Sequence, residues 1–273
     1  MSSIIRVYRV FNLLSLDVVG GAVVSALFFA RLFYVNVRPI GLIALGLTVW
    51  IIYTTDHIRD VSKVVGTAST ERHRFHQVHY KKLIILTIFA IGLAIVAILF
   101  IKQQVLEWGI ALSLVVVAYI IAQRSLKFLK EIFIAILYTC GVLLLSIPVS
   151  NVPLTTVHYM LIFQFGITAL ANLIMFSWFD RELDQIDKRY SFVTKTGEPG
   201  TRLVIWLLLV LQLTMTVIQW IVGSLTVPSL IVGLMGLSLL LIFIFREPLE
   251  KNECYRLLGD AVFFLPATYL LLQ

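Results

Sequence analysis

The sequence predicts an all-α protein: a polytopic membrane bundle of about nine transmembrane helices in one domain, residues 1–273. Three observations support this prediction. Of the 273 residues, 60% are hydrophobic and only 14% are charged, which is too apolar for a water-soluble domain. The apolar residues form long continuous runs, whereas the strands of a membrane barrel are about ten residues of alternating polarity. The basic residues gather in every second connection between the runs.

Nine apolar runs approach the length of about 20 residues that a membrane-spanning helix needs. They cover residues 11–35, 40–55, 83–101, 108–122, 132–149, 157–179, 203–222, 230–245 and 257–272. Several are short, so the count is approximate. The first run follows Arg6 and Arg9, as in a signal peptide, but it is long and lacks a cleavage site of small residues. We therefore expect it to be retained as a helix.

The basic residues predict the orientation of the bundle. Nineteen of the 22 Lys and Arg residues lie before the first run or in every second connection after it. Because cytoplasmic loops carry the excess of Lys and Arg, we expect a cytoplasmic N-terminus and an outside C-terminus in a bacterial-type inner membrane. This topology accounts for the net charge of +7, so membrane lipids, and no nucleic acid, are the expected surroundings.

Two long connections on the predicted cytoplasmic side begin with matching acidic pairs. Asp56 and Asp60 end the second run, and Asp180 and Asp184 end the sixth. The pairs are displaced by 124 residues and separated by an even number of runs, so they face the same side. The pattern indicates two related halves around one cytoplasm-facing cavity, since sites in membrane repeats commonly lie at the interface of the halves.

Each acidic pair can present two carboxylates to one space, because residues i and i+4 share a helix face. Four carboxylates would repel one another without cations. Hard oxygen ligands suit Mg²⁺, which binds a few carboxylates together with substrate phosphates. One such pair alone would more simply be a helix cap or a partner of nearby arginines. Two pairs on one side predict a clamp that holds a diphosphate through Mg²⁺.

A diphosphate also needs cationic hydrogen-bond donors. The candidates on the same side are Arg59, Arg72, Arg74, Arg124, Lys127, Lys130 and Lys188. Each of them taken alone is more simply a residue of the positive-inside pattern. Only their shared side with the carboxylates makes them a predicted substrate-binding group.

Polar residues inside the runs predict a cavity or a polar partner, because ionisable groups are costly at membrane depth. Asp17, Asn172 and Asp260 fall toward the cytoplasmic part of their runs. We expect Asp17 and Asn172 to contact substrate or to support the residues that do. Hydrogen bonding between helices is the alternative for each of them.

Two further groups of side chains flank the aspartates. The histidines of "RHRFHQVH", at positions 73, 76 and 79, have a spacing that could suit a transition metal, but a solvated basic loop or a lid is the favoured interpretation. The aromatic residues Trp50, Tyr53, Phe176, Trp178 and Phe179 predict either a channel that stabilises an allylic cation or an interfacial belt.

The acidic motifs resemble those of the UbiA superfamily of intramembrane prenyltransferases. "FDRELDQID" from Phe179 is similar to the second motif of that family and "DHIRD" from Asp56 to the first. The resemblance implies a nine-helix bundle in which the four paired aspartates act as catalytic metal ligands, with Asp187 assisting. The sequence departs from the family pattern at Ile52, where asparagine is usual, and at Leu126, where tyrosine is expected four residues before the lysine aligned with Lys130.

The resemblance also implies a function. It suggests an enzyme that uses Mg²⁺ to transfer a prenyl group from an isoprenoid diphosphate to a lipophilic acceptor. Two alternatives remain. One is a cyclase of the same fold that uses no acceptor, and the other is a non-catalytic lipid-binding or transport protein whose acidic clusters bind ions or head groups.

Overall fold

The regular elements of the chain are all helical. The computed structural model describes residues 3–62, 64, 66–68, 70–186, 190–223 and 225–272, with the backbone alone for residues 3–6, 123–125, 127 and 252. Within these ranges the α-helices are α1 Ser3–Leu13, α2 Leu16–Leu32, α3 Pro39–Val61, α4 Glu71–Val78, α5 Tyr80–Ile98, α6 Gln103–Leu126, α7 Lys130–Leu143, α8 Thr156–Phe179, α9 Arg181–Ile186, α10 Phe192–Val222, α11 Thr226–Ile244, α12 Arg246–Glu250, α13 Cys254–Ala261 and α14 Ala267–Leu271. Short 3-10 helices cover η1 Lys127–Leu129, η2 Ile147–Val149, η3 Lys251–Glu253 and η4 Val262–Phe264. The all-α prediction is confirmed.

The chain is a multi-pass integral membrane protein. In the part of the chain that the structure describes, eight helical stretches are long and apolar enough to cross a membrane. A ninth is added if the bent pair α1 and α2 is one span; the two helices meet at 81°. The bend divides the predicted run 11–35, because Ser15 takes a left-handed conformation with φ of 57° and interrupts the helix.

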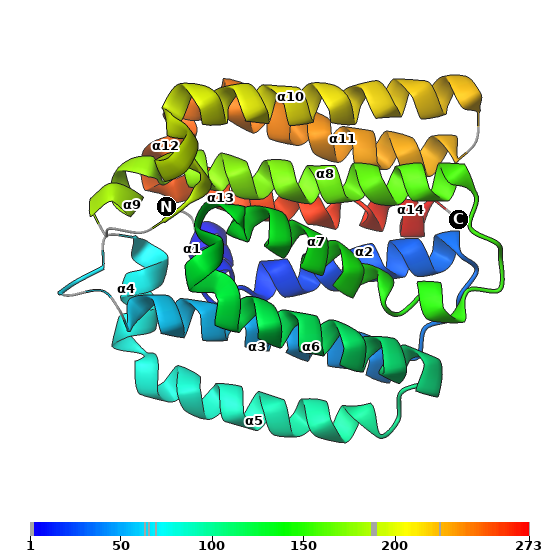
Figure 1. Cartoon of the computed structure of the whole chain (residues 1–273), viewed down its shortest axis with the longest axis horizontal. Coiled ribbons are helices and arrows are strands. Elements are labelled where there is room, and N and C mark those ends of the chain that lie inside the picture. The colour runs from blue at the N-terminus through cyan, green and yellow to red at the C-terminus, as the bar shows by residue number, and fades with distance from the viewer. Residues whose placement is uncertain are drawn as a thin grey trace.

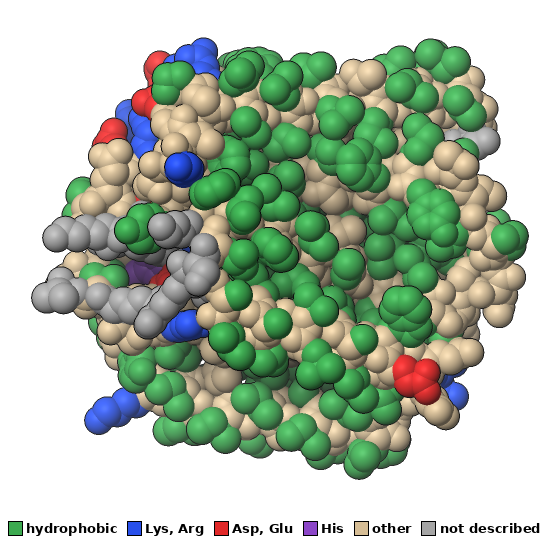
Figure 2. All heavy atoms as spheres, in the orientation of Figure 1, with side chains coloured by type: hydrophobic (Ala, Val, Ile, Leu, Met, Phe, Trp, Pro, Cys, Tyr) green, Lys and Arg blue, Asp and Glu red, His purple; other side chains and the backbone are tan. Residues whose placement is uncertain are grey.

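Helix α8 lies at the centre of the bundle, with α10 and α11 on one side and α7 and α2 on the other (Figure 1). Of its membrane-spanning window 67% is buried, compared with 11% for α6. Helices α5 and α6 are peripheral and expose large apolar side chains such as Leu114 and Ile121. Figure 2 shows apolar side chains across one whole face, with the charged groups gathered at its two ends. Such a surface suits contact with lipid.

The two long polar connections lie at the same end of the bundle. Helix α4, which follows the first acidic pair, and helix α9, which contains Asp184 of the second, are both at the left end in Figure 1. The short connections after α2, α5 and α10 lie at the opposite end. This arrangement agrees with the prediction that both long connections share one side of the membrane.

Some buried polar residues join helices through hydrogen bonds. The side-chain amide of Gln164 on α8 donates to Thr216 Oγ1 of α10 at 2.7 Å. Gln219 on α10 donates to Gln164 Oε1 at 2.9 Å. Gln212, also on α10, donates to the carbonyl of Val232 on α11. These contacts between α8, α10 and α11 are interhelical hydrogen bonds of the kind that stabilises membrane bundles.

Close packing of α13 against α8 brings the last span to the acidic end. A Cβ atom at Gly259 would lie 2.6 Å from Asn172 Oδ1 and 2.6 Å from the Phe176 ring. Glycine therefore permits an approach that a larger residue could keep only if Asn172 and Phe176 moved. As a result, Arg256 and Asp260, on either side of this contact in the sequence, reach the same cavity as Asn172.

Candidate functional site

A cavity of about 190 Å³ opens at the end of the bundle that carries α4 and α9. Its lining comes from both halves of the chain, including α3, α7, α8 and α13. Charged groups gather on part of the wall, and Tyr138, Phe263 and Ile134 add an apolar part. The cavity can therefore accept a ligand with a charged head and an apolar tail.

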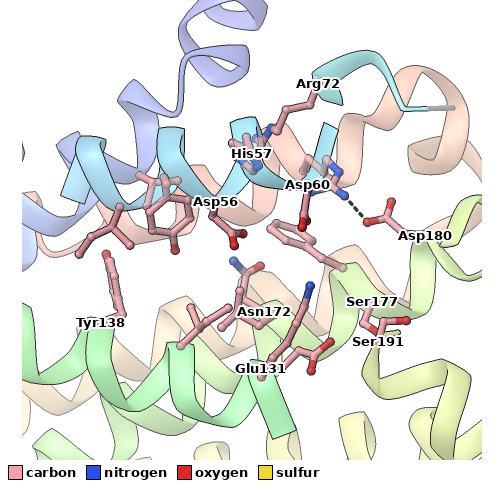
Figure 3. A pocket seen from close by; sticks show the side chains of 18 of the residues that line it. Asp56, His57, Asp60, Arg72, Glu131, Tyr138, Asn172, Ser177, Asp180 and Ser191 are labelled. Carbon is pink, nitrogen blue, oxygen red and sulfur yellow. Dashed lines mark hydrogen bonds and ion pairs between the residues drawn. The ribbon is translucent and has the colours of Figure 1, made fainter. Parts of the chain in front are cut away.

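The first acidic pair lies on the last two turns of α3. Asp56 and Asp60 both line the cavity and are half-buried. Figure 3 shows both carboxylates projecting from α3 into the space above α7 and α8, with Asp56 directed toward Asn172. The pair shares one face because α3 continues without a break to Val61.

The second acidic pair lies where α8 ends and α9 begins. Asp180 is the last cap residue of α8, and the amide of Asp184 donates to the Asp180 carbonyl at 2.8 Å. This helical hydrogen bond keeps both side chains on one face, and both are buried and line the cavity. The structure thus brings the two pairs into one cavity across 124 residues of sequence.

Both oxygens of Asp180 accept hydrogen bonds from α13. The Tyr255 hydroxyl donates to Oδ1, and Arg256 Nη2 donates to Oδ2 as an ion pair (Figure 3, dashed line). The ring of Tyr255 stacks on Phe179 at 4.2 Å between centroids. Asp180 is therefore held by a cation and a phenol that neither motif analysis nor charge patterning identified.

Three of the predicted cationic residues line the cavity with the carboxylates. Arg59, Arg72 and Lys130 come from α3, α4 and the first residue of α7. Arg59 Nη1 also donates to the carbonyl of Ile120 on α6 at 2.6 Å. This hydrogen bond holds one end of the guanidinium against the cavity wall. These groups lie where they can neutralise an anionic head group.

Other predicted residues lie elsewhere. Arg74 is exposed, is absent from the described lining of the cavity, and donates to the carbonyl of Ala68 at 3.4 Å. Asp187 and Lys188 lie outside the described residues, as do the side chains of Arg124 and Lys127. For these four the site assignment stays a prediction.

A buried polar cluster connects the cavity wall to the N-terminus. Asn12 Nδ2 donates to Asp17 Oδ2 and, at 3.2 Å, to Asp260 Oδ2. Arg72 Nη2 lies 3.0 Å from Asn12 Oδ1 and 3.5 Å from Asp260 Oδ2. Asp17 is fully buried behind the wall, whereas Arg72 and Asp260 also line the cavity. The cluster ties α4, α1, α2 and α13 together beside the site.

Helix α4 is a packed cover and not a solvated loop. Thr70 caps its start by accepting the His73 amide at 3.3 Å, and His73 and His76 are buried. Their rings approach His57 of α3 at centroid distances of 6.0 and 4.9 Å. Of the two predicted interpretations, a solvated loop or a lid, the solvated loop is wrong for these two histidines. Burial is the main cause that lowers the pKa of His76 from its ordinary value, and its Nδ1 donates to the Arg72 carbonyl at 2.9 Å.

The aromatic residues near the aspartates divide into those that line the cavity and those that pack elsewhere, among them Phe179, which stacks on Tyr255. Tyr53 and Phe176 line the cavity. Trp50 instead donates to the carbonyl of Leu14 at 3.0 Å, and Trp178 is buried against Phe243 at 5.4 Å between ring centroids. Only the first group is placed to contact a ligand.

Sequence reasoning missed several residues of the cavity. Glu131 is buried, and its Oε1 accepts the amide of Phe192 at 3.0 Å, so it connects α7 to the start of α10. His57 lies between the two aspartates of α3 and lines the cavity. The only sequence signal for Glu131 was an acidic residue next to the apolar run 132–149, and Arg256 was hidden among the basic residues of a cytoplasmic connection.

The donor set of the cavity fits Mg²⁺. The described lining contains six acidic residues, namely Asp56, Asp60, Glu131, Asp180, Asp184 and Asp260. Among the described residues no three Asp, Glu, His or Cys side chains are grouped closely enough to hold a metal ion by themselves. Mg²⁺ does not need such a cage, because it typically uses one or two carboxylates, several waters and substrate phosphates.

The fold and the acidic cavity define a class of protein: a polytopic helical bundle with a charged site at one end of its spans. Solved structures share this fold. The chain superposes on a UbiA homologue from Aeropyrum pernix K1 in its apo form with a TM-score of 0.65 at 12% identity, covering 93% of this chain and 96% of that one. The fold of this protein is therefore that of the UbiA homologues.

Two further structures agree. A UbiA homologue from Archaeoglobus fulgidus bound to DMAPP and Mg²⁺ gives a TM-score of 0.63 at 12% identity, with coverage of 96% of this chain and 99% of that one. A structure described as digeranylgeranylglyceryl phosphate synthase in membranes gives 0.53 at 14% identity, with 95% of each chain covered. No model of a known protein family and no curated protein matches the sequence.

Proposed function

We propose that this protein is a Mg²⁺-dependent intramembrane prenyltransferase that moves a prenyl group from an isoprenoid diphosphate to a lipophilic acceptor. The observation that carries the proposal is the meeting of two DxxxD pairs in one cavity with an apolar extension. The likeness of the fold to a UbiA homologue bound to DMAPP and Mg²⁺ supports it. The cavity end would face the cytoplasm, in accordance with the distribution of Lys and Arg.

The residues of the cavity divide the work between the two ends of the donor. Asp56, Asp60, Asp180 and Asp184 would hold Mg²⁺, with Asp187 following the second pair in sequence. When bound, Mg²⁺ supplies positive charge that stabilises the leaving diphosphate. Arg59, Arg72 and Lys130 also line the cavity and would add hydrogen bonds to the diphosphate oxygens.

The chemistry proceeds as the charge on the leaving group is neutralised. The bond between the allylic carbon and the diphosphate oxygen breaks, and the electron pair leaves with the diphosphate. Tyr138, Phe176 and Phe263 line the space for the carbon chain, where aromatic faces favour a cation. The acceptor then supplies the electron pair of the new bond and loses a proton to solvent at the open end of the cavity, while the apolar walls keep water from the cation.

The test offers dimethylallyl, geranyl, farnesyl and geranylgeranyl diphosphate to the purified protein in lipid nanodiscs, with Mg²⁺ or EDTA. We expect release of inorganic diphosphate only with Mg²⁺, and a prenylated lipid in the mass spectrum of the extract when host lipids are added. A cyclic or rearranged hydrocarbon without acceptor would favour the cyclase. No release of diphosphate from any donor would overturn the enzyme and favour the lipid-binding alternative.

Ile52 provides a second test of the metal site. Its side chain lines the cavity one helical turn before Asp56. The family that the sequence resembles usually has asparagine at this position. We expect Ile52→Asn to lower the half-saturating Mg²⁺ concentration for diphosphate release severalfold, because an amide oxygen joins the ligands at the correct spacing. Ile52→Leu is the matched control and should leave it unchanged. A higher Mg²⁺ requirement in Ile52→Asn would contradict the assignment of Asp56 to the metal.

A further inference from the structure

Arg256 is a cavity residue that belongs to no acidic motif and to no predicted substrate group. It lies on the first turn of α13, and its side chain is only 14% exposed. Helix α13 approaches α8 closely at Gly259, beside Asn172 and Phe176, and the guanidinium lies beside Asp180 of the second acidic pair. The Arg256 guanidinium carbon is 5.3 Å from the Phe176 ring centroid and 5.7 Å from that of Tyr255.

The contacts of Arg256 place a cation where a metal would bind. Nη2 of Arg256 and the hydroxyl of Tyr255 together take both oxygens of Asp180. Each oxygen of Asp180 thus accepts one hydrogen bond, and the positive charge of Arg256 lies where it would repel a metal ion bound to the same carboxylate. Nε of Arg256 finds no hydrogen-bond acceptor within the described part of the chain, although Glu253 Oε2 lies 3.9 Å away. The guanidinium therefore keeps a donor for a further anion.

The charge of the cavity explains why such a cation is needed. The described lining has six acidic residues and four Lys or Arg residues, the latter being Arg59, Arg72, Lys130 and Arg256. Buried carboxylates without a cation are strongly destabilised. Loading Mg²⁺ onto Asp180 would place two cations on one carboxylate, and a diphosphate carries enough negative charge to accept one of them.

We propose that Arg256 is a diphosphate-binding residue with two alternative partners. It pairs with Asp180 in the absence of Mg²⁺ and diphosphate, and it pairs with the diphosphate when Mg²⁺ binds to Asp180. The inference rests on the proposed function. It predicts that Mg²⁺ and diphosphate bind cooperatively. Diphosphate draws Arg256 away from Asp180 and so removes a positive charge that repels Mg²⁺, and Mg²⁺ on Asp180 releases Arg256 to bind the diphosphate. Such coupling is reciprocal, so diphosphate raises the affinity for the metal by the same factor as the metal raises the affinity for diphosphate.

The experiment measures binding and requires no turnover. Mn²⁺ replaces Mg²⁺ as a probe that electron paramagnetic resonance detects, and it is titrated into nanodisc-bound protein with and without inorganic pyrophosphate. A parallel titration without protein corrects for the Mn²⁺ that pyrophosphate binds in solution. The variants are Arg256→Gln, which removes the cation, and Arg256→Lys, which keeps it. Arg38→Gln is the matched control, since it removes one charge at an exposed position about 27 Å along α3 from Asp56.

We expect wild type and Arg38→Gln to bind Mn²⁺ weakly alone and at least about tenfold more tightly with pyrophosphate. Arg256→Gln should bind Mn²⁺ at least about tenfold more tightly than wild type without pyrophosphate, and its gain from pyrophosphate should shrink to less than about threefold. Arg256→Lys should behave like wild type. These results together would support both partners of Arg256.

Other results would overturn the inference in distinguishable ways. If wild type and Arg256→Gln bind Mn²⁺ equally, with equal gains from pyrophosphate, Arg256 does not compete for Asp180, and the metal-dependent function stands without it. If wild type binds no Mn²⁺ even with pyrophosphate, both the inference and the proposed metal site fail. Should Arg256→Gln fail to elute as a folded protein, Arg256→Lys and the pyrophosphate dependence of wild type still decide, since a wild type without coupling would refute the proposal.

Discussion

Replacing Asp180 by asparagine should lower the rate of diphosphate release by at least about a hundredfold. The substitution removes the negative charge that would bind the metal, and the metal stabilises the leaving group. Asp180 is buried, lines the cavity and accepts from Tyr255 and Arg256. Asparagine keeps the shape and one oxygen but no negative charge. The measurement is the initial rate of diphosphate release at saturating donor over a range of Mg²⁺ concentrations.

The control for Asp180→Asn is Glu107→Gln, an equivalent loss of one negative charge at an exposed position near the start of α6. This variant should retain wild-type rates. Full activity of Asp180→Asn with an unchanged Mg²⁺ requirement would remove the second acidic pair from the mechanism. The lipid-binding alternative would then be the better explanation of the acidic cavity.

Replacing Arg72 by methionine should destabilise the protein by about 3–5 kcal/mol, because it leaves buried carboxylates without their cation. Arg72 Nη2 lies 3.5 Å from Asp260 Oδ2 and donates to Asn12 Oδ1 at 3.0 Å. Asp17 and Asp260 are both buried around this contact. The measurement is the free energy of unfolding in mixed micelles, obtained by titrating the folded protein with SDS.

A double variant separates the lost ion pair from lost packing. Arg72→Met with Asp260→Asn should be less destabilised than the sum of the two single variants, since the uncompensated charge is gone. Arg74→Met, an exposed arginine on the same helix, should cost at most about 1 kcal/mol. Additive losses in the double variant would show that Arg72 and Asp260 do not interact energetically.

Prediction from sequence worked where the geometry is local. Within the described residues, eight of the nine apolar runs overlap single membrane-length helical stretches, because a run of about 20 apolar residues can satisfy its backbone in lipid only as a helix. The Asp56 and Asp60 pair was predictable because residues four apart share a face of any continuous helix. The side shared by the two long connections followed from the asymmetry of Lys and Arg, which depends only on the order of the runs.

Prediction was weaker where the structure depends on a break within a helix or on contacts between residues far apart in the sequence. The 81° bend between α1 and α2 occurs at one residue with left-handed backbone angles, Ser15. Glycine at this position would have indicated such a conformation, but serine does not. The burial of His73 and His76 under α3 could not be read from a segment with mixed charge and no apolar periodicity. Arg256 was counted among ordinary basic loop residues, because nothing within its own helix distinguishes it.

The sequence by itself determined that this protein spans the membrane as a helical bundle and carries two acidic pairs on one side. Helical periodicity and the cost of unpaired backbone in lipid make both properties local. The sequence also predicted one cavity for the two pairs, but only the tertiary structure decided that Arg256, 76 residues beyond Asp180, pairs with it there. The tertiary structure also decided that Asn12 meets Asp260 across 248 residues. Such contacts depend on how helix faces pack, and small residues such as Gly259 set that packing only in the presence of their distant neighbours.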